Sequence, residues 1–312
     1  MYKKNGKILI FFYSIWLLIT LNIQADVIVS IRPLAFIATA ITKGITNVNI
    51  LLNQGISPHN YILKPSDLWK IKKSDLFIWI GMDIENFLEK SLAQIPTYKT
   101  IQLSKIPNIM KIIMQNNNNI LNDGNSNFKI NENYSHHAYN MHIWLSPHIA
   151  RIIAKVIHAQ LSIIFHEHQT LLDKNLKSFN IKLNQMNINI HNDLKYIKNK
   201  KYYVFHDAYS YFENNYHLSP LGVFTINHSI QPGVKKIYEI KKILNKNQSI
   251  PIFIEPQFKP AIIHKITKNN NIKICILDPL GNNIILNSDS YMKFLSSISN
   301  IFKKCLLYNK GD

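Results

Sequence analysis

Arginine is nearly missing from this sequence of 312 residues, which holds only Arg32 and Arg151 among its 36 lysines and arginines. The formal net charge of +18 is large, and a basic balance of this size can indicate a nucleic-acid partner. Guanidinium, however, is the preferred group for bidentate contacts with phosphates and bases. The lysines are also scattered along the chain, among abundant asparagine and isoleucine. We therefore interpret the charge as compositional drift and predict no nucleic-acid partner.

Long uncharged hydrophobic runs are confined to the N-terminus. The mean hydropathy of -0.06 and the hydrophobic fraction of 46% are those of a globular protein rather than a disordered or multi-spanning one. Residues 1–25 differ, because three lysines in "MYKKNGK" precede the apolar "ILIFFYSIWLLITL", and "NIQA" ends on a small residue. This order predicts a secretory signal peptide cleaved after Ala25, which would release a periplasmic protein. An uncleaved anchor is the alternative, since the apolar run is near the short end for a membrane span.

Cysteine is as scarce as arginine, with only Cys275 and Cys305 in the whole chain. The N-terminal region has none, which argues against a lipid-anchored lipoprotein. An even number in an exported chain permits one disulfide, which would tie the C-terminus to a late strand. Two unpaired buried thiols are the alternative, and we expect the disulfide.

Short apolar runs rich in β-branched residues recur in two sets. The first set lies at residues 26–31, 48–52, 76–80 and 100–103. The second set lies at residues 202–205, 221–226, 250–254 and 272–277. Longer stretches with helical spacing separate most of these runs, which predicts parallel sheets covered on both faces. The predicted fold class is therefore α/β, with two lobes that are each a mostly parallel sheet flanked by helices.

The region between the two sets has a different character. Residues 115–141 are polar, rich in asparagine and without periodicity, so we expect a flexible surface loop. From Pro147 the apolar residues recur at helical spacing, and neither proline nor glycine interrupts residues 167–197. A single long helix is predicted to join the lobes and hold them at a nearly fixed separation. The predicted divisions are an N-terminal lobe over 26–146, a helical segment over 147–200 and a C-terminal lobe over 201–312.

Residues that can bind metals follow several of the predicted strands. His59 comes after the second strand, His206 directly follows "YYVF", and Asp278 directly follows "IKICIL". His142 joins them from the end of the asparagine-rich loop. Ligands bind at the carboxyl edge of open parallel sheets. These positions therefore predict a metal site supplied by both lobes, although a loop histidine taken alone is usually a solvated polar residue.

Several longer stretches are similar to a known family. They are "GISPHNYILKPSDLWKIKKSDLFIWIG", "MHIWLSP", "YYVFHDAYSYF", "TINHSIQPG", "EPQFKPA" and "LDPLGNN". Together they resemble the metal-specific periplasmic binding proteins of ABC uptake systems, above all the zinc-specific members. The resemblance covers essentially the whole chain after the signal peptide, in order. It implies two α/β lobes joined by a long rigid helix, with the metal site in the inter-lobe cleft.

The resemblance also implies roles for the candidate ligands. His59 and His142 match the share of the site held by the N-terminal lobe, and His206 matches that of the C-terminal lobe. Asp278 matches a position that supplies a carboxylate in some members and is replaced by water in others. Three imidazoles with a carboxylate or water suit tetrahedral Zn²⁺, whereas manganese-importing relatives carry a carboxylate at the position of His206. The implied transported ligand is therefore Zn²⁺, with copper and nickel left open by ligand type alone.

Other residues are expected around the metal. Asp207 and Glu255 are candidates for holding a ligating imidazole in the tautomer that presents its free nitrogen. Trp144 and Tyr209 are expected to wall the cleft.

The sequence departs from the family pattern in two places. Many zinc-specific members carry a long loop rich in histidine and acidic residues where this chain has residues 115–141, which keep only His136 and His137. The resemblance therefore does not extend to zinc capture by that loop. Cys305 matches one partner of the disulfide in related proteins, but Cys275 lies in a different strand from the other partner. The pairing would then require neighbouring strands to bring the two within reach.

The predicted function is high-affinity capture of Zn²⁺ in the periplasm and its delivery to an ABC-transporter membrane permease with a cytoplasmic ATPase. The chain is predicted to be no enzyme, and to act as a monomer that does not span the membrane once the signal is cleaved. One alternative is a binding protein or adhesin of the same fold for manganese or another divalent metal. The other is a zinc-dependent hydrolase, since three protein ligands plus water also describe a catalytic site.

Overall fold

The computed structural model describes residues 26–122, 139–225, 233–246, 250–257 and 272–307. The predicted signal peptide, residues 1–25, lies outside these ranges and stays a prediction. Most of the asparagine-rich segment, residues 123–138, also lies outside them.

Four parallel strands form the sheet of the N-terminal lobe, in the order β2-β1-β3-β4. The strands are β1 (Val27–Val29), β2 (Val48–Ile50), β3 (Leu76–Trp79) and β4 (Thr100–Gln102). The helices are α1 (Arg32–Ile41), α2 (Pro65–Lys73), α3 (Glu89–Leu92) and α4 (Pro107–Asn122). The central strands β1 and β3 are buried at every position. That burial on both faces is why their sequences are unbroken apolar runs.

The C-terminal lobe repeats this arrangement, with four parallel strands in the order β6-β5-β7-β8. The strands are β5 (Tyr203–His206), β6 (Gly222–Thr225), β7 (Ile252–Ile254) and β8 (Ile274–Ile276). The helices are α7 (Ser210–Tyr216), α8 (Val234–Lys246) and α10 (Ser290–Leu307). The predicted fold class and the eight predicted strands are confirmed. In each sheet the strand order reverses beside the first strand, which is the switch point where α/β sheets bind ligands.

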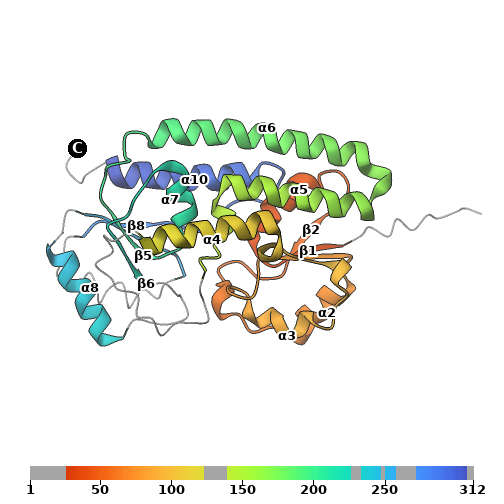
Figure 1. Ribbon diagram of the computed structural model, residues 1–312, viewed down its shortest axis with the longest axis horizontal. Helices are drawn as coiled ribbons and strands as arrows, with labels where there is room; N and C mark the ends of the chain where they lie inside the picture. Colours follow the sequence, from red (N-terminus) through yellow and green to blue (C-terminus); the bar gives the residue numbers. More distant parts are fainter. Residues whose placement is uncertain (1–25, 123–138, 226–232, 247–249, 258–271, 308–312) are drawn as a thin grey trace, which may run out of the picture.

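The predicted long helix is confirmed as α6 (Gln169–Leu194), which has 26 residues. It follows α5 (Pro147–Ile164) after a short turn and extends over both lobes, packing on α1, α5 and α10 (Figure 1). Its buried side chains recur every three or four residues, as a helix with one core face requires. Among the described residues no single helix is long and apolar enough to cross a membrane. Helix α5 and residues His166–Leu194 are long and apolar enough only when taken together, and a bend of 119° separates them.

One continuous hydrophobic cluster extends through both lobes, from Val27 in β1 to Phe302 in α10. A second, smaller cluster lies in the C-terminal lobe and contains Phe205, Phe224 and Ile240. Because the main core crosses from one sheet to the other, large relative movements of the lobes would expose apolar surface and cost free energy. The predicted divisions at residues 146 and 200 stay predictions, since the packing continues across them.

The beginning of the expected surface loop is helical, which corrects the prediction for residues 115–122. Helix α4 begins at Pro107 and continues to Asn122. It is held by buried Ile109 and Ile113, and by Asn116, whose Nδ2 donates to Ser210 Oγ at 3.2 Å. These contacts with the rest of the protein outweigh the weak helix propensity of asparagine, which a composition-based prediction cannot anticipate.

The two cysteines form a disulfide, which confirms that prediction. Cys275 lies in β8 and Cys305 in α10, with their Cα atoms 6.3 Å apart. The bond joins the last strand of the second sheet to the C-terminal helix.

Candidate metal centre

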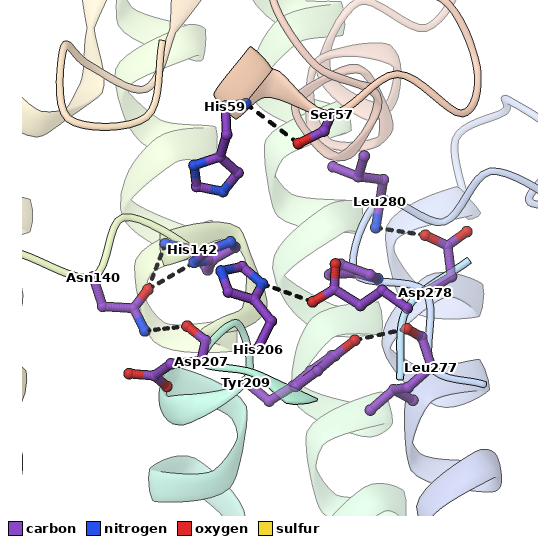
Figure 2. Close-up of polar contacts among 12 residues, drawn as sticks. Ser57, His59, Asn140, His142, His206, Asp207, Tyr209, Leu277, Asp278 and Leu280 are labelled. Atoms are coloured by element: carbon purple, nitrogen blue, oxygen red, sulfur yellow. Dashed lines mark hydrogen bonds and ion pairs between the residues drawn. The ribbon is translucent and has the colours of Figure 1, made fainter. Parts of the chain in front are cut away.

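Three histidines from separate parts of the chain converge between the two lobes. Ligand atoms of His59, His142 and His206 all lie within 4.8 Å of one another. The ring centroids are 5.4 Å apart for His59 and His142, 5.5 Å for His59 and His206, and 4.8 Å for His142 and His206 (Figure 2). No other group of three or more histidine, cysteine or acidic residues among the described ranges could hold a metal ion in this way.

His59 is presented by a short turn whose sequence explains its geometry. Pro58 begins the 3₁₀ turn Pro58–Asn60, and Ser57 precedes it in an extended conformation. The Oγ of Ser57 accepts the backbone N–H of His59 at 3.3 Å. Serine is favoured at such a position because its side chain satisfies a donor that the turn leaves open. The turn therefore fixes the backbone of His59 while its ring stays half-buried.

His206 is the last residue of β5, and its side chain is 0% exposed. Its Nδ1 lies 2.7 Å from Oε1 of Glu255, which directly follows β7 and is also buried. Since β5 and β7 are neighbours across the switch point of the sheet, the topology itself brings this pair together. A carboxylate accepts the proton of Nδ1, so the lone pair of the imidazole lies on Nε2. The predicted role of Glu255 as the partner of a ligating imidazole agrees with this contact.

His142 lies at the start of the 3₁₀ turn Ile143–Leu145, and its ring is oriented by a residue that the sequence analysis missed. Both its backbone N–H and its Nδ1 contact Oδ1 of Asn140, at 3.0 and 2.8 Å. The sequence signal that could have identified Asn140 is an amide side chain two residues before a candidate ligand. Asp207, the other candidate for such a role, contacts the partner of His142 rather than a ligating ring: its backbone carbonyl accepts from Asn140 Nδ2 at 2.8 Å.

Burial raises the pKa of the Asp207 carboxyl, while the nearby His206 and a hydrogen bond from Asn140 act in the opposite direction. Burial also raises the pKa of the Tyr209 phenol far above its ordinary value, and the carboxylates of Glu255 and Asp278 add to that shift. Tyr209 is therefore a neutral donor, and its hydroxyl donates to the carbonyl of Leu277 at 2.6 Å.

Asp278 is not part of the histidine cluster. Its Oδ1 accepts the backbone N–H of Leu280 at 2.9 Å, and its Oδ2 accepts that of Asn282 at 2.6 Å. In Figure 2 the carboxylate points toward Leu280 and away from the imidazoles. The structure thus brings together three of the four predicted ligands and uses the fourth to shape the turn after β8.

That turn connects the C-terminal lobe to the segment that carries His59. Asn282 accepts the backbone N–H of Gly55 on its Oδ1 at 2.9 Å, and its carbonyl accepts from Gln54 Nε2 at 2.8 Å. The guanidinium of Arg32 donates to the carbonyl of Gly281 at 3.2 Å and to that of Ile284. One of the two arginines in the chain therefore serves as a link between the lobes.

The walls of the pocket include one of the expected aromatic residues. Trp144 is fully buried, and its Nε1 donates to the carbonyl of Pro279 at 2.7 Å. The pocket beside the imidazoles is lined by Trp144, Glu255 and Gln257 among others, while Tyr209 is buried and is not part of this lining. Both side-chain amide atoms of Gln257 are buried, with no hydrogen-bond partner among the described residues. An amide so placed is available to hydrogen-bond a ligand or a water molecule in the pocket.

The geometry of the three imidazoles fits a small divalent cation. Tetrahedral zinc with Zn–N distances of ~2.0–2.1 Å places neighbouring nitrogens about 3.4 Å apart. Ligand atoms within 4.8 Å of one another therefore need only a small closure to reach that geometry. Neutral imidazole nitrogens suit zinc, copper and nickel better than they suit magnesium, calcium or manganese.

The chain is similar to known zinc-uptake proteins. The family described as "Zinc-uptake complex component A periplasmic" matches residues 27–305. The chain is 43% identical over 291 residues to the high-affinity zinc uptake system protein ZnuA of Yersinia pestis, covering 91% of this chain and 92% of that protein. It is 39% identical over 307 residues to the protein of the same name from Buchnera aphidicola subsp. Schizaphis graminum, covering 97% and 96%. The fold is similar to that of the periplasmic zinc-binding protein TroA from Treponema pallidum, with a TM-score of 0.73, 14% identity and coverage of 91% and 99%.

Proposed function

The chain belongs to the family of periplasmic zinc-uptake components, and from that membership we propose that it captures Zn²⁺ and delivers it to a membrane permease driven by an ATPase. The proposed ligands are the imidazoles of His59, His142 and His206. The observation that carries the proposal is their convergence, within 4.8 Å, from segments of two lobes that a long helix and a shared core hold together. The proposed compartment is the periplasm, which the predicted signal peptide would give access to.

Zinc is favoured over manganese by the chemistry of the donors. All three converging groups are imidazoles, whereas a manganese site would be richer in oxygen ligands. The carboxylate that lines the pocket, Glu255, is engaged with His206 Nδ1 rather than directed as a further ligand. The same engagement weighs against the hydrolase alternative, since a general base beside a metal-bound water needs an available carboxylate or imidazole.

The fourth coordination position is best assigned to a water molecule. Asp278 could supply a carboxylate only by giving up the two backbone N–H groups that it accepts in the turn after β8. Gln257 lines the same pocket with a buried amide whose hydrogen-bonding groups have no partner among the described residues. A water bound to the metal could donate to the amide oxygen of Gln257, which would satisfy that group.

Replacing Asp278 with asparagine tests this assignment. We expect Asp278→Asn to bind one zinc ion with an affinity within about tenfold of the wild type, because the carboxylate that the substitution removes is not a zinc ligand. The free energy of unfolding should fall by about 1–2 kcal/mol, since an amide can accept only one of the two backbone N–H groups. Competition with a zinc chelator and urea denaturation measure the two quantities. A loss of affinity beyond about 100-fold without a loss of stability would instead identify Asp278 as a ligand.

The proposed function is tested on residues 26–312 purified without added metal. We expect elemental analysis to find zinc, calorimetric titration of the metal-free protein to give one tight site per chain, and no turnover of ester, peptide or phosphoester substrates. Turnover would support the hydrolase alternative, and a failure to bind zinc would reject the proposal. Deleting the gene should impair growth in zinc-starved medium, which separates uptake from adhesion.

A further inference from the structure

We propose that the side-chain amide of Asn140 sets the tautomer and ring orientation of His142. Through its hydrogen bonds the same amide also links this ligand to the C-terminal lobe beside His206. The inference rests on the proposed function only in treating His142 as a zinc ligand. The side chain of Asn140 contacts His142 on one side and the C-terminal lobe, at Asp207 and Ser210, on the other. Its place in the site is that of a positioning residue, since it acts through His142.

Two backbone groups determine which way the amide of Asn140 faces. The backbone N–H of His142 can only donate, and it lies 3.0 Å from Oδ1. The backbone carbonyl of Asp207 can only accept, and it lies 2.8 Å from Nδ2. A rotation of the amide by a half-turn would place two donors together on one side and two acceptors together on the other. The orientation is therefore fixed by groups whose hydrogen-bonding roles do not vary.

The fixed amide in turn determines the tautomer of His142. Because Oδ1 must face His142, it can only accept from the Nδ1 that lies 2.8 Å away. Nδ1 therefore carries the proton, and the lone pair that can bind a metal lies on Nε2. Glu255 has the same effect on His206 through Nδ1. The two buried ligands are thus held in one tautomer by different groups, a neutral amide for His142 and a carboxylate for His206.

Asn140 also links ligands that belong to different lobes. Its Nδ2 donates to the carbonyl of Asp207, the residue after His206, and to Oγ of Ser210 at 3.0 Å. Its own carbonyl accepts the hydroxyl of Tyr211 at 2.7 Å. A small displacement of the C-terminal lobe would pull Nδ2 from its acceptors and rotate the amide away from His142. Loss of the preferred tautomer would then lower the affinity for zinc. A movement of this kind gives the transporter a means to release the metal.

The test compares two substitutions of Asn140. In Asn140→Leu, leucine has a shape similar to that of asparagine but lacks both the accepting oxygen and the donating nitrogen. In Asn140→Asp, the side chain keeps an accepting oxygen and loses the donor. The readouts are the zinc dissociation constant by chelator competition and the tautomer of His142 in the zinc-free protein. Nitrogen NMR at alkaline pH reports the tautomer, and the signals are assigned by their absence in His142→Ala. We expect the wild type and Asn140→Asp to carry the proton on Nδ1. We expect Asn140→Leu to give a tautomer mixture and about 10–100-fold weaker binding.

The control is Asn189→Leu, the same change at an exposed position on α6, which should leave both readouts unchanged. The inference is overturned if Asn140→Leu keeps the wild-type tautomer, or if Asn140→Asp loses the tautomer as fully as Asn140→Leu does. Circular dichroism of each variant checks folding. If the wild type fails to bind zinc, the proposed function fails, while the tautomer of the zinc-free protein still decides the role of Asn140.

Discussion

Zinc binding is expected to weaken by at least about 100-fold when His206 is replaced by alanine. Structural zinc sites with four ligands contribute roughly 10–16 kcal/mol, so one ligand accounts for about 3 kcal/mol on average, and each 1.4 kcal/mol is tenfold in affinity. The effect should be larger than for a partner of a ligand, because His206 is the ligand that the C-terminal lobe contributes. Its loss also deprives buried Glu255 of the Nδ1–H that it accepts at 2.7 Å.

Chelator competition measures the affinity, and thermal unfolding of the zinc-free protein measures the cost to the fold. His148→Ala is the matched control, since His148 is an exposed histidine at the start of α5. The zinc affinity of Glu255→Gln should lie between those of His206→Ala and His148→Ala, about 10–100-fold weaker than the wild type. The reason is that glutamine keeps an oxygen that can accept from Nδ1 but loses the negative charge. If His206→Ala bound zinc as tightly as His148→Ala, the imidazole cluster would not be the zinc site.

The strands could be predicted from the sequence because parallel strands buried on both faces leave a plain apolar signature. Each predicted run overlaps a strand, although most of the strands are shorter than their runs, as with Val27–Val29 within residues 26–31. Helix α6 was predictable for a similar reason, since its core face repeats without a proline or glycine. The end of α4 was not, because Asn116 is held by Ser210, which is 94 residues away in sequence. Contacts at that separation leave no local pattern.

The histidine cluster was predictable because strand ends meet at one edge of a sheet, and this places His206 without knowledge of any side-chain contact. The neighbours of the ligands were harder to identify. Glu255 directly follows a strand, as a group at the binding edge of a sheet does, whereas Asn140 lies in a segment without strand or helix. Asp278 has the same position relative to its strand as a ligand would have. Its backbone contacts with Leu280 and Asn282 are visible only in three dimensions.

The contacts around the site suggest how a rigid protein can release its metal. A shared core and α6 restrict the lobes to small movements. Small movements are sufficient here, because His206 is oriented by a bond between strands, and Asn140, which orients His142, is itself bonded to the other lobe. The bonds from Asn140 to Asp207 and from Gly55 to Asn282 each join the two lobes near a ligand. Hydrogen bonds fail over displacements of about 1 Å, far less than a cleft opening requires.

Removing the disulfide is expected to lower the free energy of unfolding by about 3 kcal/mol while leaving zinc affinity nearly unchanged. Cys275 and Cys305 are 30 residues apart, and closing a loop of that length restricts the unfolded chain by about 3–4 kcal/mol. The affinity should persist because the ligands and their partners lie at β5, β7 and the turns at His59 and His142, none of which the bond joins.

Urea denaturation and chelator competition on the double variant Cys275→Ala with Cys305→Ala measure the two effects. A reducing agent is the control, since it should destabilise the wild type and leave the double variant as it is. Weaker zinc binding by the folded double variant would contradict the expectation that the disulfide affects stability alone. It would mean that the bond also positions the turn that begins at Asp278.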